Sequence, residues 1–328
     1  MKIECLTQKD TEEIKALVAS YKFNEYRNYR IIKKNKKEEY LFSQVSGLAA
    51  NNKEACVVVA KDGAKIVGLA SLIKLPWDSR HFGFNMAKIG HLMVSGDYNK
   101  AFSVKKALVS FILQICRKED IRHVSCRIDT SDFTSLHVLE ADDFRIMDTM
   151  VTYIFNRFKH RLPCLKKLYD VRLFRQEDLS SLLEIAYNRL LYGRFYNDVH
   201  LPRQKTEKMY MEWIKNYCSD LEQNRVFVIE KKNRVSGFLL YKKNMELERS
   251  CGIKIIGSGL SVVSPDAKGG YPALVMATAE DVISLSYDIS EYDTQLNNYE
   301  SIKVMQGFGL DYVKSRYTLH KWLPKSNE

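Results

Sequence analysis

The 328-residue sequence has no long apolar run and no paired cysteine motif. No window approaches the roughly 20 apolar residues that a membrane-spanning helix needs, and residues 1–5 show no apolar core of a signal peptide. The seven cysteines are scattered, odd in number and without a Cys-x-x-Cys pair. We therefore expect a cytoplasmic protein with reduced thiols, without a disulfide or zinc framework.

Signatures of nucleic-acid and metal binding are also missing. The net charge of +11 favours anionic partners, but the basic run at residues 33–37 is followed by Glu38 and Glu39, as on a solvated face. No zinc-finger, RNP or basic-zipper pattern is present. His123, His137 and His200 lack metal-ligand spacing. We expect no nucleic-acid partner and no metal.

What the sequence does contain is a long internal repeat. Gln8 and Gln176 open similar helical patterns, at an offset of 168 in the numbering. A strand, turn and strand at residues 57–70 return at 226–239, where Gly237 matches Gly68 at an offset of 169. Near the two ends, Ser135 and Ser301 begin matching segments at an offset of 166. Offsets this long exclude a solenoid unit of 20–50 residues and predict two copies of one globular domain.

The apolar pattern of each copy predicts the same order of secondary-structure elements: strand, helices, antiparallel hairpin, strand, helix, strand, helix, strand. The last five elements are expected at 89–94, 101–116, 123–128, 135–140 and 150–155 in the first copy, and at 260–263, 272–285, 288–294, 298–306 and 312–319 in the second. The fold class is α/β, with two tandem domains, each a mixed, mostly antiparallel sheet flanked by helices. We predict domains at 1–158 and 168–328, joined by a basic stretch that contains Pro163.

This order, with a glycine-containing loop between a central strand and a helix, resembles the GNAT acyltransferase superfamily. The tandem form resembles the dTDP-fucosamine (TDP-4-amino-4,6-dideoxygalactose) N-acetyltransferase branch over nearly the whole chain. The segments that carry this resemblance are 75–84, 194–198 with Tyr210 and Trp213, 294–298 and 317–322. It implies transfer of an acyl group, with acetyl as the first candidate, from acyl-CoA to the amine of a nucleotide-linked amino sugar or a similar small amine. It also allows a homodimer.

The resemblance implies a cofactor site in the second domain. In the superfamily two strands splay apart, the pantetheine arm of acyl-CoA fills the space like an added strand, and a loop and helix N-terminus bind pyrophosphate. The residues that would bind acyl-CoA here are Val262, Val263, Lys268, Gly269, Gly270, Tyr271 and Asn298. Residues 267–273 match the family's loop only in part, and Pro272 removes one N–H donor. An ordinary strand-to-helix turn is the alternative interpretation of this loop.

The first domain lacks the loop motif and has Asp97 where phosphate would lie. The resemblance therefore implies that it binds no CoA, supports the second domain and supplies one wall of the acceptor pocket. Acceptor binding is implied for Trp77, Asp78, Arg194, Tyr196, Asp198 and Tyr210, because arginine suits phosphate and carboxylate suits a sugar hydroxyl or amine. Structural roles, such as a buried tryptophan or helix-capping aspartates, are the alternative.

The catalytic acid is not evident from the sequence. Attack of an amine on a thioester needs a neutral amine, a donor for the oxyanion and a proton for the thiolate. The N–H near Val263 could polarise the carbonyl, but Met305 stands where many relatives have the acidic tyrosine and cannot donate a proton. Tyr299 and Tyr271 are the candidate acids, with Tyr317, water or unassisted thiolate departure as alternatives. A degenerate tandem GNAT that only binds or scaffolds, or an enzyme for a peptide, antibiotic or other amine, also fits.

Overall fold

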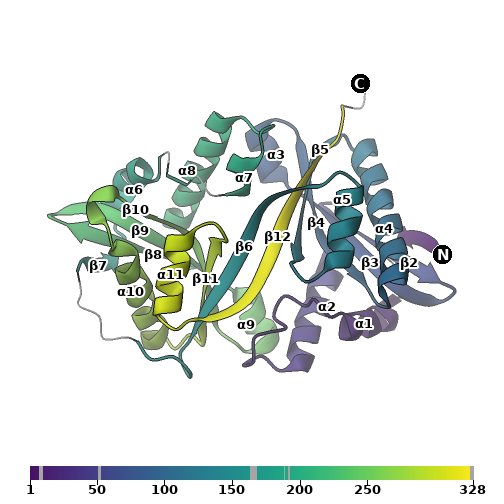
Figure 1. Cartoon of the computed structure of the whole chain (residues 1–328), viewed down its shortest axis with the longest axis horizontal. Helices are drawn as coiled ribbons and strands as arrows, with labels where there is room; N and C mark the ends of the chain where they lie inside the picture. The colour runs from purple at the N-terminus through teal and green to yellow at the C-terminus, as the bar shows by residue number, and fades with distance from the viewer. Residues whose placement is uncertain (7–9, 51–52, 163–167, 188, 191–192, 326–328) are drawn as a thin grey trace. The chain divides into compact units, whose positions relative to one another are not determined.

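The computed structural model describes the chain apart from residues 7–9, 51–52, 163–167, 188, 191–192 and 326–328. Two compact units are described separately below (Figure 1): unit 1 comprises Met1–Thr149 and Ser315–Glu328, and unit 2 comprises Met150–Lys314. Pro163, in the predicted linker, lies outside the described residues. Among the helices described, none is both long and apolar enough to cross a bilayer.

Unit 1 contains one mixed sheet in the order β1-β2-β3-β4-β5-β12. Among its described strands, only β4 and β5 are parallel neighbours. Its elements are β1 (Lys2–Cys5), α1 (Thr11–Ser20), α2 (Lys34–Ala50), β2 (Ala55–Asp62), β3 (Lys65–Lys74), α3 (Pro76–Phe82), β4 (Asn85–Val94), α4 (Tyr98–Lys118), β5 (Ile121–Asp129), α5 (Phe133–Ala141), the start of β6 (Arg145–Asn156) and the end of β12 (Asp311–Trp322).

Unit 2 repeats this plan, with its described strands in the order β7-β8-β9-β10-β11-β6 and only β10 and β11 parallel among them. Its elements are β7 (Asp170–Leu173), the 3-10 turn η2 (Gln176–Asp178), α6 (Leu179–Ala186), α7 (Arg194–Asn197), α8 (Arg203–Ser219), β8 (Asn224–Lys231), β9 (Arg234–Lys243), α9 (Met245–Cys251), β10 (Ile255–Val263), the 3-10 turn η3 (Pro265–Ala267), α10 (Gly270–Ser284), β11 (Ile289–Gln295) and α11 (Tyr299–Gly307). The predicted fold class is therefore confirmed.

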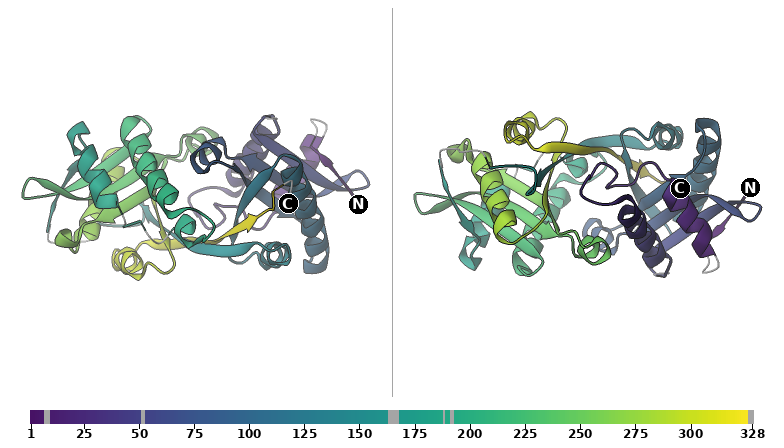
Figure 2. Two further views of the ribbon diagram at one scale, coloured as in Figure 1. Left: turned by 90° about the horizontal axis from the view of Figure 1, so that it is seen from above. Right: turned by 90° about the horizontal axis from the view of Figure 1, so that it is seen from below.

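Helices cover both faces of each sheet because the strands are apolar on both sides. In β8, Val226 and Val228 pack with α6 and α8, whereas Phe227 and Ile229 pack with α10 and α11. Alternate residues of a strand point to opposite faces, so a continuous apolar run must be buried on both. Figure 2 shows α6 and α8 in front of this sheet from above and α10 in front of it from below. In unit 1, likewise, α1 and α2 cover one face of the sheet, and α4 and α5 cover the other.

The structure confirms the predicted repeat and extends it. The last five elements predicted for each of the two repeats are all present, within a few residues of their expected bounds. Two short helices that the pattern did not predict, α3 and α9, occupy equivalent places after the hairpins. Both end at a left-handed glycine, Gly83 with φ 84° and Gly252 with φ 68°, a conformation that favours residues without a Cβ.

The closing strands are exchanged between the repeats. β6 belongs to the first repeat in sequence, but its residues 150–156 pair with β11 in unit 2. β12 belongs to the second repeat, but residues 316–322 pair with β5 in unit 1. The sheet of each compact unit is therefore completed by a strand from the other repeat. The ranges 1–158 and 168–328 describe the two repeats in the sequence and stay a prediction.

Candidate functional site

The parallel strands of unit 2 separate halfway along their length. β10 and β11 pair from Ile255–Ile289 to Gly257–Glu291 and not beyond in the described register. β11 remains paired with β6 as far as Gln295, and β10 with β9 as far as Val263. The register of β10 against β9 shifts between residues 258 and 261, as at a β-bulge, which bends one strand away from its neighbour. We call the place where residues 259–263 of β10 no longer pair with β11 the β10/β11 splay.

Backbone groups of β10 point into this splay. The N–H of Ser264 donates to the C=O of Ser236 at 2.9 Å, and Val263 is paired with Gly237. Because ladder bonds alternate in direction along an antiparallel pair, the N–H and C=O of Val263 point away from β9, as do those of Ser261. Ser261 is also exposed although it lies on an interior strand. The splay thus offers the donors and acceptors that an added strand would use.

A loop and a helix N-terminus follow the splay directly. Gly269 precedes α10 with φ +84°, a conformation that L side chains rarely adopt. An ideal Cβ on Gly270 would lie 2.5 Å from Ile229 Cδ1, so the first turn of α10 packs closely on β8. Lys268 is exposed, and its C=O accepts a hydrogen bond from Tyr169 Oη at 2.8 Å. In the described structure no side chain caps α10, which leaves its first N–H groups for an anion.

The equivalent place in unit 1 is closed to an anion. β4 and β5 also stop pairing, after Ile89–Cys126. The carboxylate of Asp97, however, accepts a hydrogen bond from the N–H of Lys100 at 2.9 Å and so caps α4. An aspartate at this position puts negative charge where the helix N-terminus would otherwise attract phosphate.

Two polar residues that the sequence did not single out lie at the splay. An ideal Cβ on Gly259 would lie 2.8 Å from both Cζ and Oη of Tyr217, so the tyrosine ring of α8 rests on the strand backbone. Asp293 of β11 accepts a hydrogen bond from Thr152 Oγ1 of β6. Burial raises the pKa of Tyr217, and the charge of Asp293 raises it further. Nothing in the local pattern of either residue distinguishes it from an ordinary helix or strand position.

The predicted cofactor residues lie around the splay in different environments. Val262 is 7% exposed and packs toward α6 and α8, whereas Val263 packs toward α10. Burial, and then the neighbouring Tyr292, raise the pKa of Tyr271 in the first turn of α10. Asn298 caps α11, since its Oδ1 accepts from the N–H of Ser301 at 3.4 Å.

The two candidate acids differ in exposure. Tyr299 is 69% exposed at the start of α11, whereas Tyr271, in the first turn of α10, is half-buried against the core beneath that helix. Met305 is 0% exposed and belongs to the core beneath α10. Met305, at the position where the resemblance implied an acid, therefore serves packing in this chain.

The predicted acceptor residues of unit 2 form an aromatic group. Tyr196 and Tyr210 stack with ring centroids 5.5 Å apart and planes 7° apart, and Trp213 meets Tyr210 edge-on at 5.3 Å. Gly193 permits this packing, because an ideal Cβ there would lie 2.2 Å from Tyr210 Oη. Arg194 opens α7 next to this group.

The remaining predicted acceptor residues are caps or helix residues. Asp198 follows α7, is 2% exposed and accepts a hydrogen bond from the N–H of His200 at 3.1 Å, as in a turn. Trp77 and Asp78 belong to α3 of unit 1, where Trp77 stacks on His81 with centroids 5.5 Å apart. Their predicted acceptor roles stay predictions.

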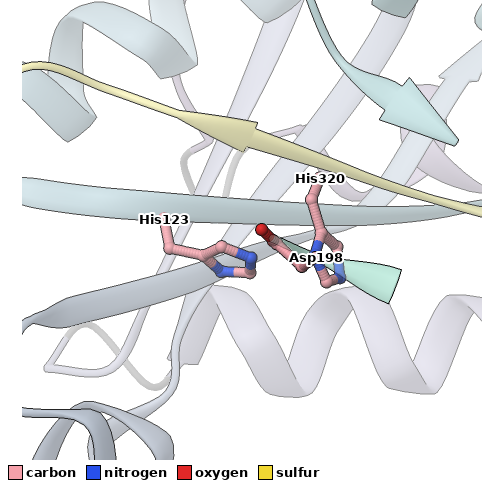
Figure 3. A group of neighbouring side chains, drawn as sticks. All are labelled: His123, Asp198 and His320. Atoms are coloured by element: carbon pink, nitrogen blue, oxygen red, sulfur yellow. The ribbon is translucent and has the colours of Figure 1, made fainter. Parts of the chain in front are cut away.

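Unit 1 contains a buried histidine pair that linear spacing could not reveal. His123 of β5 and His320 of β12 are each 1% exposed, with ring centroids 4.4 Å apart (Figure 3). Figure 3 also labels Asp198, which belongs to unit 2. The two histidines are distant in the sequence and become neighbours through the pairing of β5 with β12. Two imidazoles are fewer ligands than a zinc site uses, so the pair does not make a metal site by itself.

Comparison with known proteins identifies the fold. No protein-family model and no curated protein matches the sequence. Among solved structures, a GCN5-related N-acetyltransferase from Sphaerobacter thermophilus has a TM-score of 0.65 at 14% identity, covering 98% of this chain and 95% of that one. A tandem GNAT protein from the clavulanic acid biosynthesis pathway has a TM-score of 0.57 at 14% identity, with 99% of both chains covered.

A third neighbour is part of a larger protein. The GCN5-related glucosamine N-acetyltransferase region of a fungal multi-domain β-N-acetylglucosaminidase has a TM-score of 0.63 at 13% identity and covers 98% of this chain but 38% of that one. At these identities the similarity shows the fold, and the chain has that of a tandem GNAT protein.

Proposed function

We propose that this protein is an acyl-CoA-dependent N-acyltransferase and that unit 2 binds the acyl-CoA. The observation that supports this most is the β10/β11 splay, with the backbone of Ser261 and Val263 directed into it. The amides of a pantetheine arm would bond there as an added strand does. The N–H of Val263 would polarise the thioester carbonyl. Val262, whose side chain points toward α6 and α8, is proposed to bind acyl-CoA from that face of β10.

The pyrophosphate of CoA would bind at the start of α10. Lys268 is exposed there, and the N–H groups of Gly269, Gly270 and Tyr271 open an uncapped helix. Asn298, at the start of α11, would contact the cofactor from the neighbouring helix. In unit 1 the negative charge of Asp97 lies where the phosphate would bind and would repel it. We therefore propose one acyl-CoA per chain.

For the acceptor we propose a primary amine on a nucleotide-linked amino sugar. Two points support this choice: the resemblance of residues 75–84 to the dTDP-fucosamine N-acetyltransferases, and a structural neighbour described as a glucosamine N-acetyltransferase region. Arg194 would bind phosphate, Asp198 the sugar, and the Tyr196–Tyr210 pair an apolar face of the ligand. Trp77 and Asp78 are proposed as further acceptor residues.

Calorimetric titration of acetyl-CoA into the full-length protein tests the proposal. We expect one site per chain with a dissociation constant on the order of micromolar, a typical value for an enzyme substrate. Lys268→Glu should weaken binding by up to about tenfold, which corresponds to about 1.4 kcal/mol. Lys65→Glu is the matched control, because it makes the same charge change on an exposed hairpin of unit 1.

The outcome separates an enzyme from a scaffold. If neither acetyl-CoA nor a longer acyl-CoA binds, the acyltransferase proposal fails, and the core position of Met305 favours a GNAT domain that has lost catalysis. If Lys65→Glu weakens binding as much as Lys268→Glu, the cofactor site is misplaced. If acetyl-CoA binds, a panel of amino sugars and other amines then identifies the acceptor.

A further inference from the structure

Tyr217 and Asp293 lie at the two strands that border the β10/β11 splay: Tyr217 contacts β10, and Asp293 belongs to β11. Tyr217 lies on Gly259, within the part of β10 that has left β11. Asp293 lies on β11 two residues beyond Glu291, the last residue that pairs with β10. An acyl group held between these strands would therefore have a phenol on one side and a carboxylate on the other.

Both side chains belong to the same face of the sheet. An ideal Cβ on Gly257 would lie 3.4 Å from Glu291 Oε2, so the Glu291 side chain lies on the face to which a side chain at position 257 would point. Tyr292 points the opposite way, into the core beneath α10, so alternation returns Asp293 to the face of Glu291. α8, which carries Tyr217, covers this face.

The surroundings keep the hydroxyl of Tyr217 protonated and hold the carboxylate of Asp293 in place. Burial and the charge of Asp293 raise the pKa of Tyr217, so its hydroxyl keeps a proton at neutral pH. Thr152 Oγ1 donates to Asp293 Oδ1 and fixes the carboxylate on β11. Glu291, on the same face, pairs with Lys314 at 3.4 Å.

We propose that Asp293 and Tyr217 are the proton-transfer pair of the acyl transfer, an inference that rests on the proposed function. The acceptor nitrogen attacks the thioester carbonyl carbon, the C–N bond forms and the C–S bond breaks. The proton released from nitrogen goes to the carboxylate of Asp293, and the hydroxyl of Tyr217 gives its proton to the CoA thiolate. Transfer of the proton from Asp293 to the Tyr217 phenolate then restores both groups. This pair supplies the acid that position 305 lacks.

The test separates acyl-CoA binding from turnover. Tyr217→Phe keeps the ring on Gly259 and removes the hydroxyl, while Asp293→Asn keeps the shape and the acceptor for Thr152. Tyr312→Phe, at a tyrosine that is 55% exposed, is the matched control. Acetyl-CoA affinity is measured by calorimetry, and release of CoA thiol is followed first with water as the acceptor and then with D-glucosamine as a probe amine. Thermal unfolding checks each variant's fold.

We expect both variants to bind acetyl-CoA within about twofold of the wild type while thiol release falls by about 10²-fold or more, the usual contribution of a general acid or base. Tyr312→Phe should match the wild type. Wild-type turnover in Tyr217→Phe, or a loss confined to Tyr271→Phe or Tyr299→Phe, would overturn the inference while leaving the proposed function standing. Absence of acetyl-CoA binding in the wild type would instead overturn the proposed function and the inference with it.

Discussion

The ring of Tyr217 rests directly on the backbone of Gly259, and there is no room for a Cβ between them. The two residues come from distant parts of unit 2, one from α8 and one from the bulged part of β10. Their contact brings a phenolic hydroxyl to the place where two parallel strands separate. The glycine in this strand is therefore explained by close approach of a side chain.

A methyl group at this position should disturb that contact. Gly259→Ala puts a Cβ 2.8 Å from the Tyr217 ring, and we expect a loss of about 1–3 kcal/mol in the free energy of unfolding, as for an overpacked core. Gly257→Ala is the control on the same strand, because its Cβ meets Glu291 Oε2 at an ordinary 3.4 Å. Urea unfolding of the two variants measures the difference. Equal stability would contradict the placement of Tyr217.

The direction of one N–H group gives a prediction about binding. Val263→Pro removes the donor that points into the splay but keeps the adjacent bond between Ser264 and Ser236. We expect acetyl-CoA affinity to fall by about tenfold or more, since a donor to the bound acyl-CoA is lost. Val94→Pro is the control, because Val94 pairs with Gly68 in unit 1 as Val263 pairs with Gly237 in unit 2. Calorimetry that found the two variants equally weakened would argue against a single site in unit 2.

A histidine in unit 1 should make stability depend on pH. Burial lowers the pKa of His91 to about 4, and its Nδ1 lies 2.9 Å from Ser71 Oγ. The unfolded chain, with an ordinary histidine pKa of about 6.5, then binds more protons than the folded one between these values, so stability falls as the pH is lowered through this window.

The size of the effect and its control follow from the same linkage. Lowering the pH from 7 to 4.5 should cost on the order of 1–3 kcal/mol through His91. His91→Gln keeps a polar group for Ser71 and should remove most of this dependence, whereas His137→Gln, at an exposed histidine, should keep it. Urea unfolding at several pH values provides the comparison. A dependence unchanged in His91→Gln would show that other groups cause it.

Local patterns along the chain were enough to predict the repeat and the order of its elements. Apolar periodicity placed strands and helices such as α11, predicted at residues 298–306 and observed at Tyr299–Gly307, because local patterns of burial decide local structure. The same pattern predicted a glycine-containing loop between the strand at 260–263 and the helix at 272–285, and Gly269 of this loop has the positive φ that favours glycine. Met305 was also recognised as unable to donate a proton, and it lies in the core.

The strands that complete each sheet, and the contacts between side chains distant in the sequence, follow from tertiary packing. β6 and β12 have the alternating pattern of any closing strand, and that pattern does not name a partner that is distant in the sequence. The members of the Tyr217–Asp293 and His123–His320 pairs are also far apart along the chain, so helix packing and strand pairing bring each pair together. Local sequence encodes the direction in which a side chain points, and only the fold sets what lies opposite it.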